Sequence, residues 1–570
     1  MGVRGLKTFL ETIVPDGMKK VQIEQELKEF QNLERKSPLV LIDLQALAYL
    51  WSSTDNLTFG MRSNIIIQKA NQCFERFKNS GAKLAFFEGG SVHSAKENYF
   101  LKDRHESKQM KVEVIRDLES GMGFKQVLQK HRKSLRGLST IISLLKEVAH
   151  KYGTINTPTT GEKHTVMAGY SNTNQVFAIV GNDTNFLIYC GKWRYWNVEE
   201  FEFESFMVKQ YNAVALRGYL NLTTEQMPLF ATLSCNQIID FEDFKIFHGR
   251  NGLKKRYEKV SNFVRQQRYP LHSRDLERIT KIVFQGKPNI EEYINKITLS
   301  LDSYNWRDTL CQEKESNPFL NQLLNEEWNT HYQILKNFPA IILSSYIDLQ
   351  EQDFLKPFSE LALTILKRHM GILWQHKNNA NLRREVYVST SVSRPVKRIL
   401  VEAEYPKFEV PPLDKLIFRS IDDCLDKQRY DLLKFIIGPN LDVEKLFSLD
   451  DPFIPTVVIL YYFVKEAGLE FDEADILLLS VFNVIHKKSR NELEFPKNVS
   501  VRAFKIVFLF IKFQRMVLPI FASLGFKHLA KHVPFDGLYF HILWQEWHEM
   551  DENHKGFQRE SINKLRLYDD

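Results

Sequence analysis

Three carboxylates each follow a short apolar run in the first 200 residues of the chain. Asp43 ends the run LVLID, Glu88 follows AKLAFF, and Asp183 comes shortly after QVFAIVG. Runs that are apolar at every position are typical of parallel strands buried on both faces. Because the carboxyl ends of parallel strands meet at one edge of a sheet, these acids are expected to converge there. Converging carboxylates are the ligands that hard divalent cations prefer, and two such cations can clamp both the attacking and the leaving oxygen of a phosphodiester.

An acid after a strand also has an ordinary interpretation, because it is often a helix N-cap or a solvated turn residue. One such acid would carry no weight, but three in the same kind of position favour a common site. A common site does not by itself establish catalysis, because the carboxylates could equally form a hydrogen-bonded polar pocket.

The segments between the runs have helical periodicity, notably 64–79 and 138–152. Strands alternating with helices predict an α/β fold with a mostly parallel sheet flanked by helices. After about residue 250 the pattern is helical, as in 290–299, 324–335 and 357–374. The predicted organisation has four parts: an α/β domain over 1–250, a helical extension over 251–376, a polar and basic connector over 377–398, and an α-helical C-terminal domain over 399–570.

Composition excludes several classes of protein. The 570 residues carry 77 basic and 70 acidic side chains, for a net charge of +7, which permits a polyanionic partner without requiring one. The cysteines lie far apart and form no C-x-x-C pair, which disfavours a disulfide framework and fits a reducing compartment: Cys73, Cys190, Cys235, Cys311 and Cys424. The sequence shows no secretory signal, its two most apolar stretches (453–464 and 506–511) are short, and Lys512 and Arg515 interrupt the second. We expect a protein of the nucleus or cytoplasm that does not span a membrane.

Five segments, in order, resemble the motifs of one superfamily. They are the opening MGVRGLKTFLE, the strands LVLIDLQALAYLW and AKLAFFEGG, the ungapped stretch EKHTVMAGYSNTNQVFAIVGNDTN, and PLFATLSCNQII. Together they resemble the XPG/flap-endonuclease-like (PIN-type) superfamily. The resemblance implies a PIN-like domain and, if the chain is active, a nuclease that uses Mg²⁺ or Mn²⁺.

The resemblance also assigns positions at the metal centre. It implies that four carboxylates stand where the superfamily has catalytic and metal-binding acids: Asp43, Glu88, Glu162 and Asp183. Neutral or weakly basic residues stand at the other acidic positions: His164, Asn185, and Asn236–Gln237. Neutral amides are poorer ligands for a divalent cation, and His164 suits Mg²⁺ badly. The losses predict that the second metal site is gone while a first remains arguable.

A narrower resemblance lies within the superfamily. FFEGG with YFLKDRHESKQMKVEVIRDLESG, and later MPLFATLSCNQIIDFEDFKIFHG, resemble the constitutive coactivator of PPAR-gamma family, near Asteroid. The matching residues of the second segment are Asn236, Gln237, Glu242, Asp243, Phe247 and His248. Glu88 and Asn185 depart from that family's pattern, and the resemblance covers residues 1–250. It implies a scaffold without nuclease activity that binds RNA or protein partners in gene regulation or signalling.

Two basic clusters are candidates for contact with RNA or single-stranded nucleic acid. The first follows the second acidic strand and contains Lys102, Arg104, Lys108 and Lys111. The second contains Lys254, Lys255, Arg256, Arg265 and Arg268, interleaved with Tyr257 and Phe263. Aromatic rings among cations can stack bases while the cations neutralise phosphate, although such runs are more often solvated helix faces. Three hypotheses therefore stand: a nucleic-acid-binding pseudo-nuclease, a nuclease with a reduced site, and a protein-binding adaptor.

Overall fold

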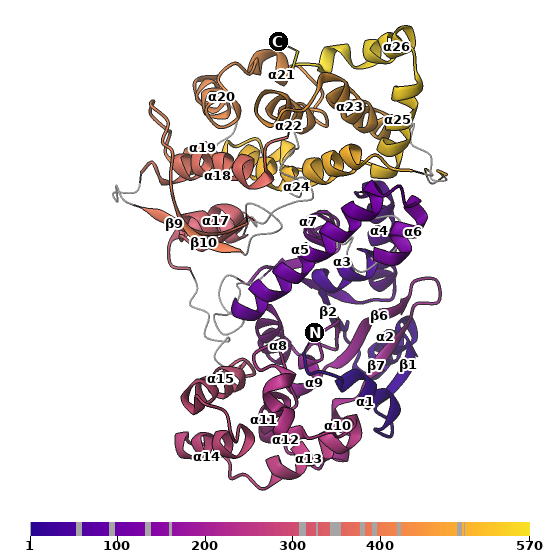
Figure 1. Cartoon of the computed structure of the whole chain (residues 1–570), viewed down its shortest axis with the longest axis vertical. Coiled ribbons are helices and arrows are strands. Elements are labelled where there is room, and N and C mark those ends of the chain that lie inside the picture. Colours follow the sequence, from indigo (N-terminus) through magenta and orange to yellow (C-terminus); the bar gives the residue numbers. More distant parts are fainter. Residues whose placement is uncertain are drawn as a thin grey trace. The chain divides into compact units, whose positions relative to one another are not determined.

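The structure is a computed structural model of the whole chain. It describes residues 2–52, 60–89, 97–131, 138–158, 162–306, 315–325, 329–342, 355–376, 382–389, 396–418, 423–486, 493–494, 496 and 498–569. The chain forms two compact units, drawn in Figure 1. Unit 1 comprises Met1–Leu50, Ala70–Lys102 and Val148–Glu313. Unit 2 comprises Trp51–Lys69, Asp103–Glu147 and Lys314–Asp570.

Unit 1 is built on a seven-stranded sheet in the order β1-β7-β6-β5-β2-β3-β4. Its strands are β1 (Met18–Gln22), β2 (Leu39–Asp43), β3 (Lys83–Phe87), β4 (Gly153–Asn156), β5 (Ala178–Gly181), β6 (Arg194–Glu202) and β7 (Met207–Tyr211). The five strands from β6 to β4 pair in parallel, whereas β7 pairs antiparallel with both β6 and β1. The α/β fold with a mostly parallel sheet is therefore confirmed, and the three apolar runs are β2, β3 and β5.

Helices cover this sheet (Figure 1). Those of the first 250 residues that lie wholly in unit 1 are α1 (Leu6–Thr12), α2 (Ile23–Glu34), α8 (Lys163–Thr173), α9 (Asn185–Ile188), α10 (Ala213–Leu220), α11 (Met227–Leu233) and α12 (Lys245–His248). Four more have one end in each unit: α3 (Leu44–Ser52), α4 (Ser63–Asn79), α5 (Glu97–Glu119) and α7 (Leu138–Ala149). β2 and β5 are buried along almost their whole length, and Leu41 and Ile179 pack with Met167 of α8 in one apolar core. Burial on both faces accounts for strands without polar alternation.

The same core continues past residue 250. It includes α13 (Leu253–Arg265), α14 (Ser273–Val283) and α15 (Ile290–Asp302), through buried side chains such as Tyr257 and Ile297. The predicted boundary at residue 250 thus falls inside unit 1, because the apolar faces of these helices are buried against the helices that precede them.

Unit 2 is mainly helical. Its helices include α6 (Phe124–His131), α16 (Pro318–Asn325), α17 (Asn329–Leu335), α18 (Phe358–Trp374), α19 (Leu413–Phe418), α20 (Asp423–Ile437), α21 (Val443–Phe447), α22 (Ile454–Tyr462), α23 (Phe471–Ile485), α24 (Val501–Ser523), α25 (Gly537–Glu549) and α26 (Glu552–Ile562). A three-stranded sheet accompanies them, in the order β10-β9-β8, with β8 (Ala340–Ile342), β9 (Arg383–Val388) and β10 (Lys397–Glu402). β9 lies in the segment expected to be an exposed connector, yet its Arg384 and Val386 are buried.

Residues far apart in sequence meet inside unit 2. Arg62 and Asp536 form an ion pair of 2.9 Å in which both side chains are buried. Val114 and Phe124, from the insertion between β3 and β4, share an apolar cluster with Phe504 and Leu538. Among the described helices one, α24, is long and apolar enough to cross a membrane, and 67% of its apolar window is buried within the structure. A core helix of a globular unit has the same properties.

Candidate acidic centre

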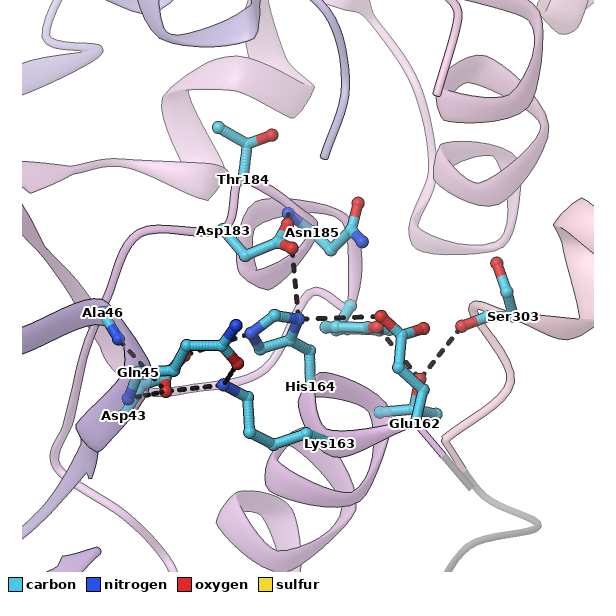
Figure 2. Close-up of polar contacts among 12 residues, drawn as sticks. Asp43, Gln45, Ala46, Glu162, Lys163, His164, Asp183, Thr184, Asn185 and Ser303 are labelled. Atoms are coloured by element: carbon cyan, nitrogen blue, oxygen red, sulfur yellow. Dashed lines mark hydrogen bonds and ion pairs between the residues drawn. The ribbon is translucent and has the colours of Figure 1, made fainter. Parts of the chain in front are cut away.

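The carboxylates of the centre come from three pieces of local structure: the end of β2, the start of α8 and the turn after β5. Asp43 is the last residue of β2, and Asp183 follows β5 by two residues. Glu162 is in extended conformation immediately before α8, which places Lys163 and His164 in the first turn of that helix. Because β2 and β5 are paired in parallel, Asp43 and Asp183 leave the sheet at the same edge. Figure 2 shows that α8 directs Lys163 toward Asp43 and His164 between the two aspartates.

The imidazole of His164 lies between the two aspartates. Its Nε2 is 3.1 Å from Oδ2 of Asp43, and its Nδ1 is 3.1 Å from Oδ2 of Asp183. The same Nδ1 is 3.7 Å from Oε1 of Glu162 (Figure 2). One ring thus contacts three of the four predicted metal ligands.

Lys163 supplies a second positive charge. Its Nζ donates to Oδ1 of Asp43 at 2.6 Å and to Oε1 of Gln45 at 2.9 Å. Asp43 Oδ1 also accepts the backbone N–H of Gln45 at 2.9 Å. Lys163 and Asp43 are both almost completely buried. An ammonium held this way needs its carboxylate, since an unpaired charge in the protein interior is strongly unfavourable.

These contacts set the protonation of the centre. Burial opposes the charge on Asp43, but Lys163 and His164 outweigh it and hold the pKa of this carboxyl well below its usual range. Burial likewise opposes the charge on Asp183, yet the amino terminus and His164 lower its pKa. For His164, burial alone would lower the pKa, while Asp183 and Asp43 raise it to about 10. At neutral pH the imidazole is therefore protonated, and two aspartates face two cations.

Asn185 and Asn236, two of the predicted degenerate positions, belong to a neutral hydrogen-bond chain. Tyr304 donates its hydroxyl to Oδ1 of Asn185 at 3.4 Å and accepts from Nδ2 of Asn236 at 3.3 Å. Asn236 also donates to Oγ of Ser300 at 2.7 Å, which in turn bonds to Thr232 at 2.7 Å. Both Ser300 and Tyr304 follow residue 250, so this hydrogen-bond chain ties the end of α15 to Asn185 and Asn236.

A surface cavity of about 590 Å³ lies beside the centre, lined by the N-terminal turn and by Asn182, Thr184 and Gln237 among others. Gly2 forms part of it with φ of 115°, and a Cβ there would lie 2.3 Å from Oγ1 of Thr184 and 2.6 Å from Oδ1 of Asp183. The N–H of Val3 donates to the same Thr184 hydroxyl at 2.9 Å. Only a glycine can bring the backbone this close to Asp183.

Glu88 lies at the end of β3, where it is half-buried and accepts a hydrogen bond of 3.1 Å from Thr157. The structure thus joins Asp43, Glu162 and Asp183 through His164. Among the described residues, no group of three or more His, Cys, Asp or Glu side chains is arranged to hold a metal ion. Both carboxylate oxygens of Asp43 and Oδ2 of Asp183 already contact Lys163 or His164. These carboxylates, as they are arranged here, therefore do not fit a divalent cation.

The comparisons with known proteins agree with the motifs. The constitutive coactivator of peroxisome proliferator-activated receptor gamma of Bos taurus is 23% identical over 251 residues, which are 43% of this chain and 35% of that protein. The chain therefore matches about a third of that relative's length. The resemblance to the constitutive coactivator of PPAR-gamma family is thus confirmed for this part of the chain. No family model matches the chain.

Solved structures similar to the chain include the catalytic core of Rad2 in complex with DNA substrate, at 13% identity over 53% of this chain and 84% of that chain, with a TM-score of 0.31. Human GEN1 in complex with Holliday junction DNA is 14% identical over 67% of this chain and 82% of that chain, with a TM-score of 0.29. GEN1 in complex with product DNA and Mg²⁺ is 13% identical over 70% of this chain and 87% of that chain, with a TM-score of 0.32.

Sequence reasoning about the first domain missed Lys163 and Gln45. A signal for Lys163 was present, because Lys163 and His164 are consecutive cations at the start of a helix. The N-terminus of a helix carries partial positive charge and favours acids. Two cations in the first turn therefore need carboxylates from elsewhere in the fold, and Asp43 and Asp183 are those carboxylates.

The coactivator-like segment after α11 is mostly structural. His248 is buried, its Nε2 lies 2.7 Å from the carbonyl of Leu233, and burial lowers its pKa to about 4. Asp243 accepts the hydroxyl of Tyr293 at 2.8 Å. These residues hold α12 and α15 in place.

The two basic clusters have different outcomes. Lys102, on α5, is exposed and 3.6 Å from Asp240, while the side chains of Arg104, Lys108 and Lys111 lie outside the described residues. In the second cluster four cations are exposed: Lys254, Lys255, Arg265 and Arg268.

The predicted roles of Arg256 and Tyr257 are wrong. Arg256 is 8% exposed, packs over Phe241 and donates to the carbonyl of Arg4 at 3.3 Å. Tyr257 is fully buried and donates to the same carbonyl at 2.6 Å. Both hold the N-terminal turn, so neither can reach a phosphate or stack a base. Phe263 packs edge-on against Phe247, with ring centroids 5.4 Å apart.

Proposed function

We propose that this chain is a PIN-like scaffold without nuclease activity that binds single-stranded nucleic acid, RNA in particular, in gene regulation in the nucleus. The absence of nuclease activity is inferred from one pair of cations. Lys163 and His164 neutralise Asp43 and Asp183 from within the fold. The similarity to a coactivator of a receptor supports the role in gene regulation, and the match spans about a third of that protein.

The neutralisation of Asp43 and Asp183 by Lys163 and His164 argues against hydrolysis by two metal ions. Divalent cations that clamp a phosphodiester need several carboxylate oxygens to offset their charge. A cation entering this centre would have to displace a buried ammonium and an imidazolium while meeting their repulsion. The low pKa values of Asp43 and Asp183 do not make the site ready for metal. They arise from His164, from Lys163 in the case of Asp43, and from the charge of the amino terminus in the case of Asp183.

A reduced nuclease is the alternative, since Glu88 and Glu162 remain as acids near the centre. The test is a cleavage assay with labelled flap, overhang and single-stranded DNA and RNA substrates, in Mg²⁺ and in Mn²⁺. We expect no cleavage above that of the Asp43→Ala variant. Cleavage by the natural chain that Asp43→Ala abolishes would overturn the proposal.

The exposed cations at and beyond α13 favour nucleic-acid binding over a purely protein-binding adaptor. Each lysine or arginine that neutralises a phosphate releases counterions, so the affinity falls with salt in proportion to the number of contacts, with a slope of about −0.7 per contact for single strands. We expect Lys254→Ala with Lys255→Ala to weaken binding of single-stranded RNA and to flatten that slope by about 1.4.

The matched control replaces Lys78 and Lys83, two exposed lysines elsewhere in unit 1, with alanine. It removes the same charge and is expected to leave the slope unchanged. Equal effects of the two pairs would show unspecific attraction, and no binding at low salt would favour the adaptor.

A further inference from the structure

β10 is the terminal strand of the small sheet in unit 2. It pairs antiparallel with β9 along all six of its residues, and among the described residues no strand lies on its other side. An edge strand offers unpaired N–H and C=O groups along its free side, and natural proteins usually protect it with charge, proline or a bulge. β10 has six regular residues, KRILVE, with no proline and no shift in register.

An apolar residue is exposed at the centre of this edge strand. Leu400 is 60% exposed, with Arg398 two residues before it and Glu402 two residues after it, both exposed. Since successive side chains of a strand alternate between faces, these three side chains share the outer face of the sheet. The alternate residue Val401 is buried on the other face.

Along the strand, this outer face presents a cation, a leucine and an anion. When a second copy of the strand runs in the opposite direction beside the first, each cation therefore lies opposite an anion. A two-fold axis perpendicular to the sheet, beside Leu400 and midway between the two strands, would place a second β10 antiparallel to the first. Leu400 would then face its own copy, and Arg398 of each chain would face Glu402 of the other. Such a pairing is isologous and closes after two chains.

We propose that β10 is a self-association edge, through which two copies of this chain join their small sheets into one six-stranded sheet. The charges on the outer face extend across the junction. Within one chain Arg398 pairs with Glu385, and Arg383 pairs with Glu402 at 2.6 Å. In the pair, Arg398 of the second chain would add to the Arg383–Glu402 pair, making a continuous ladder of alternating charge. This proposal is independent of the nucleic-acid-binding function.

The test is the molar mass of the full chain by sedimentation, at concentrations from about 1 to about 100 µM, because two-strand junctions of this size give weak association. We expect a monomer–dimer equilibrium in that range. Leu400→Asp is expected to weaken it at least about tenfold, since each change occurs twice in the symmetric junction. A chain that stays monomeric throughout, or a dimer that Leu400→Asp leaves intact, overturns the proposal.

A charge exchange identifies the register. Arg398→Glu alone and Glu402→Arg alone are each expected to weaken the dimer, because each opposes like charges across the junction. The two changes together restore the opposite charges and are expected to restore the dimer. The control Lys397→Glu alters the charge as Arg398→Glu does but lies on the other face, and it is expected to have little effect. Failure of the double variant to recover beyond either single variant rules out this register.

All these side chains except Lys397 lie on the outer face, so the variants are expected to fold. Their thermal unfolding midpoints, compared at about 1 µM, where the monomer dominates, check that expectation. If Leu400→Asp no longer forms the dimer and its unfolding midpoint also falls, Leu400→Ser replaces it, because serine removes the apolar contact without adding charge.

Discussion

The ammonium of Lys163 lies 2.6 Å from Oδ1 of Asp43, and both groups are almost completely buried. Asp43 stands where the resemblance places the leading metal carboxylate, so a covalently tethered cation now holds one of its oxygens. Two residues of one helical turn, Lys163 and His164, therefore supply the positive charge that offsets the buried carboxylates.

The first prediction concerns that ion pair. Lys163→Met removes the ammonium and leaves Asp43 with less compensation in a buried site. Breaking a buried pair from one side typically costs about 3 kcal/mol or more, so we expect a loss of that order in the free energy of unfolding by urea. The control is Lys20→Met, which breaks an exposed pair with Glu202 and is expected to change stability very little. Equal small losses for both variants would contradict a structural role for Lys163.

The second prediction concerns pH. The pKa of His164 rises from an ordinary 6.5 to about 10 in the folded protein, so protonation favours the folded state. The contribution is fully present below pH 6.5 and is lost as the pH rises to about 10, at roughly 1.4 kcal/mol per pH unit for one proton. Urea unfolding between pH 7 and pH 10 is expected to show this decline in the natural chain and a flatter profile in His164→Gln. Parallel profiles would mean that His164 is not charged in the fold.

The third prediction concerns metal. Because the carboxylates are already neutralised, millimolar Mg²⁺ or Mn²⁺ is expected to shift the thermal unfolding midpoint by less than about 1 °C, since an ion stabilises only what it binds. Replacing Lys163 with alanine and His164 with glutamate removes both cations and adds a carboxylate. That double variant is expected to gain a clear Mn²⁺-dependent shift, which calorimetric titration of Mn²⁺ would confirm. A shift of several degrees in the natural chain would show that metal competes successfully with the tethered cations.

The fourth prediction concerns Gly2. Gly2→Ala adds a Cβ that collides with Thr184 and Asp183 at a positive φ, so the N-terminal turn has to move. We expect a loss of about 1 to 3 kcal/mol in the free energy of unfolding. Gly121→Ala separates the two causes, because Gly121 has φ of 77° but nothing within 4 Å of the added carbon. Its loss is expected to be smaller, and a loss equal to that of Gly2→Ala would assign the whole effect to backbone strain.

The sheet of unit 1 could be predicted from sequence because its signals are local. β2, β3 and β5 are apolar at nearly every position and end near acids, and parallel pairing then brings Asp43 and Asp183 to one edge. The position of Lys163 could not be predicted in the same way, since it depends on the direction in which α8 leaves Glu162. The hydrogen-bond chain through Asn185 and Tyr304 depends on a contact between residues 119 positions apart, for which the sequence has no local signal.

Arg256 and Tyr257 show the opposite failure. Their cluster had the composition of a nucleic-acid-binding helix, but α13 is amphipathic, and these two residues lie on its buried face. Composition counts charges without regard to helical phase, whereas burial depends on that phase. The exposed Lys254 and Lys255, which come just before them in the sequence, remain as candidates.

The division of the chain between the units has a consequence for its synthesis. All of unit 1 has been translated by residue 313, but segments 51–69 and 103–147 belong to unit 2, which ends at residue 570. On the ribosome, the apolar cluster that joins Val114 and Phe124 to the C-terminal helices cannot form until those helices emerge, and neither can the ion pair of Arg62 with Asp536. Nascent chains of this protein therefore pass through a long interval with exposed apolar helices, which is the state that chaperones recognise.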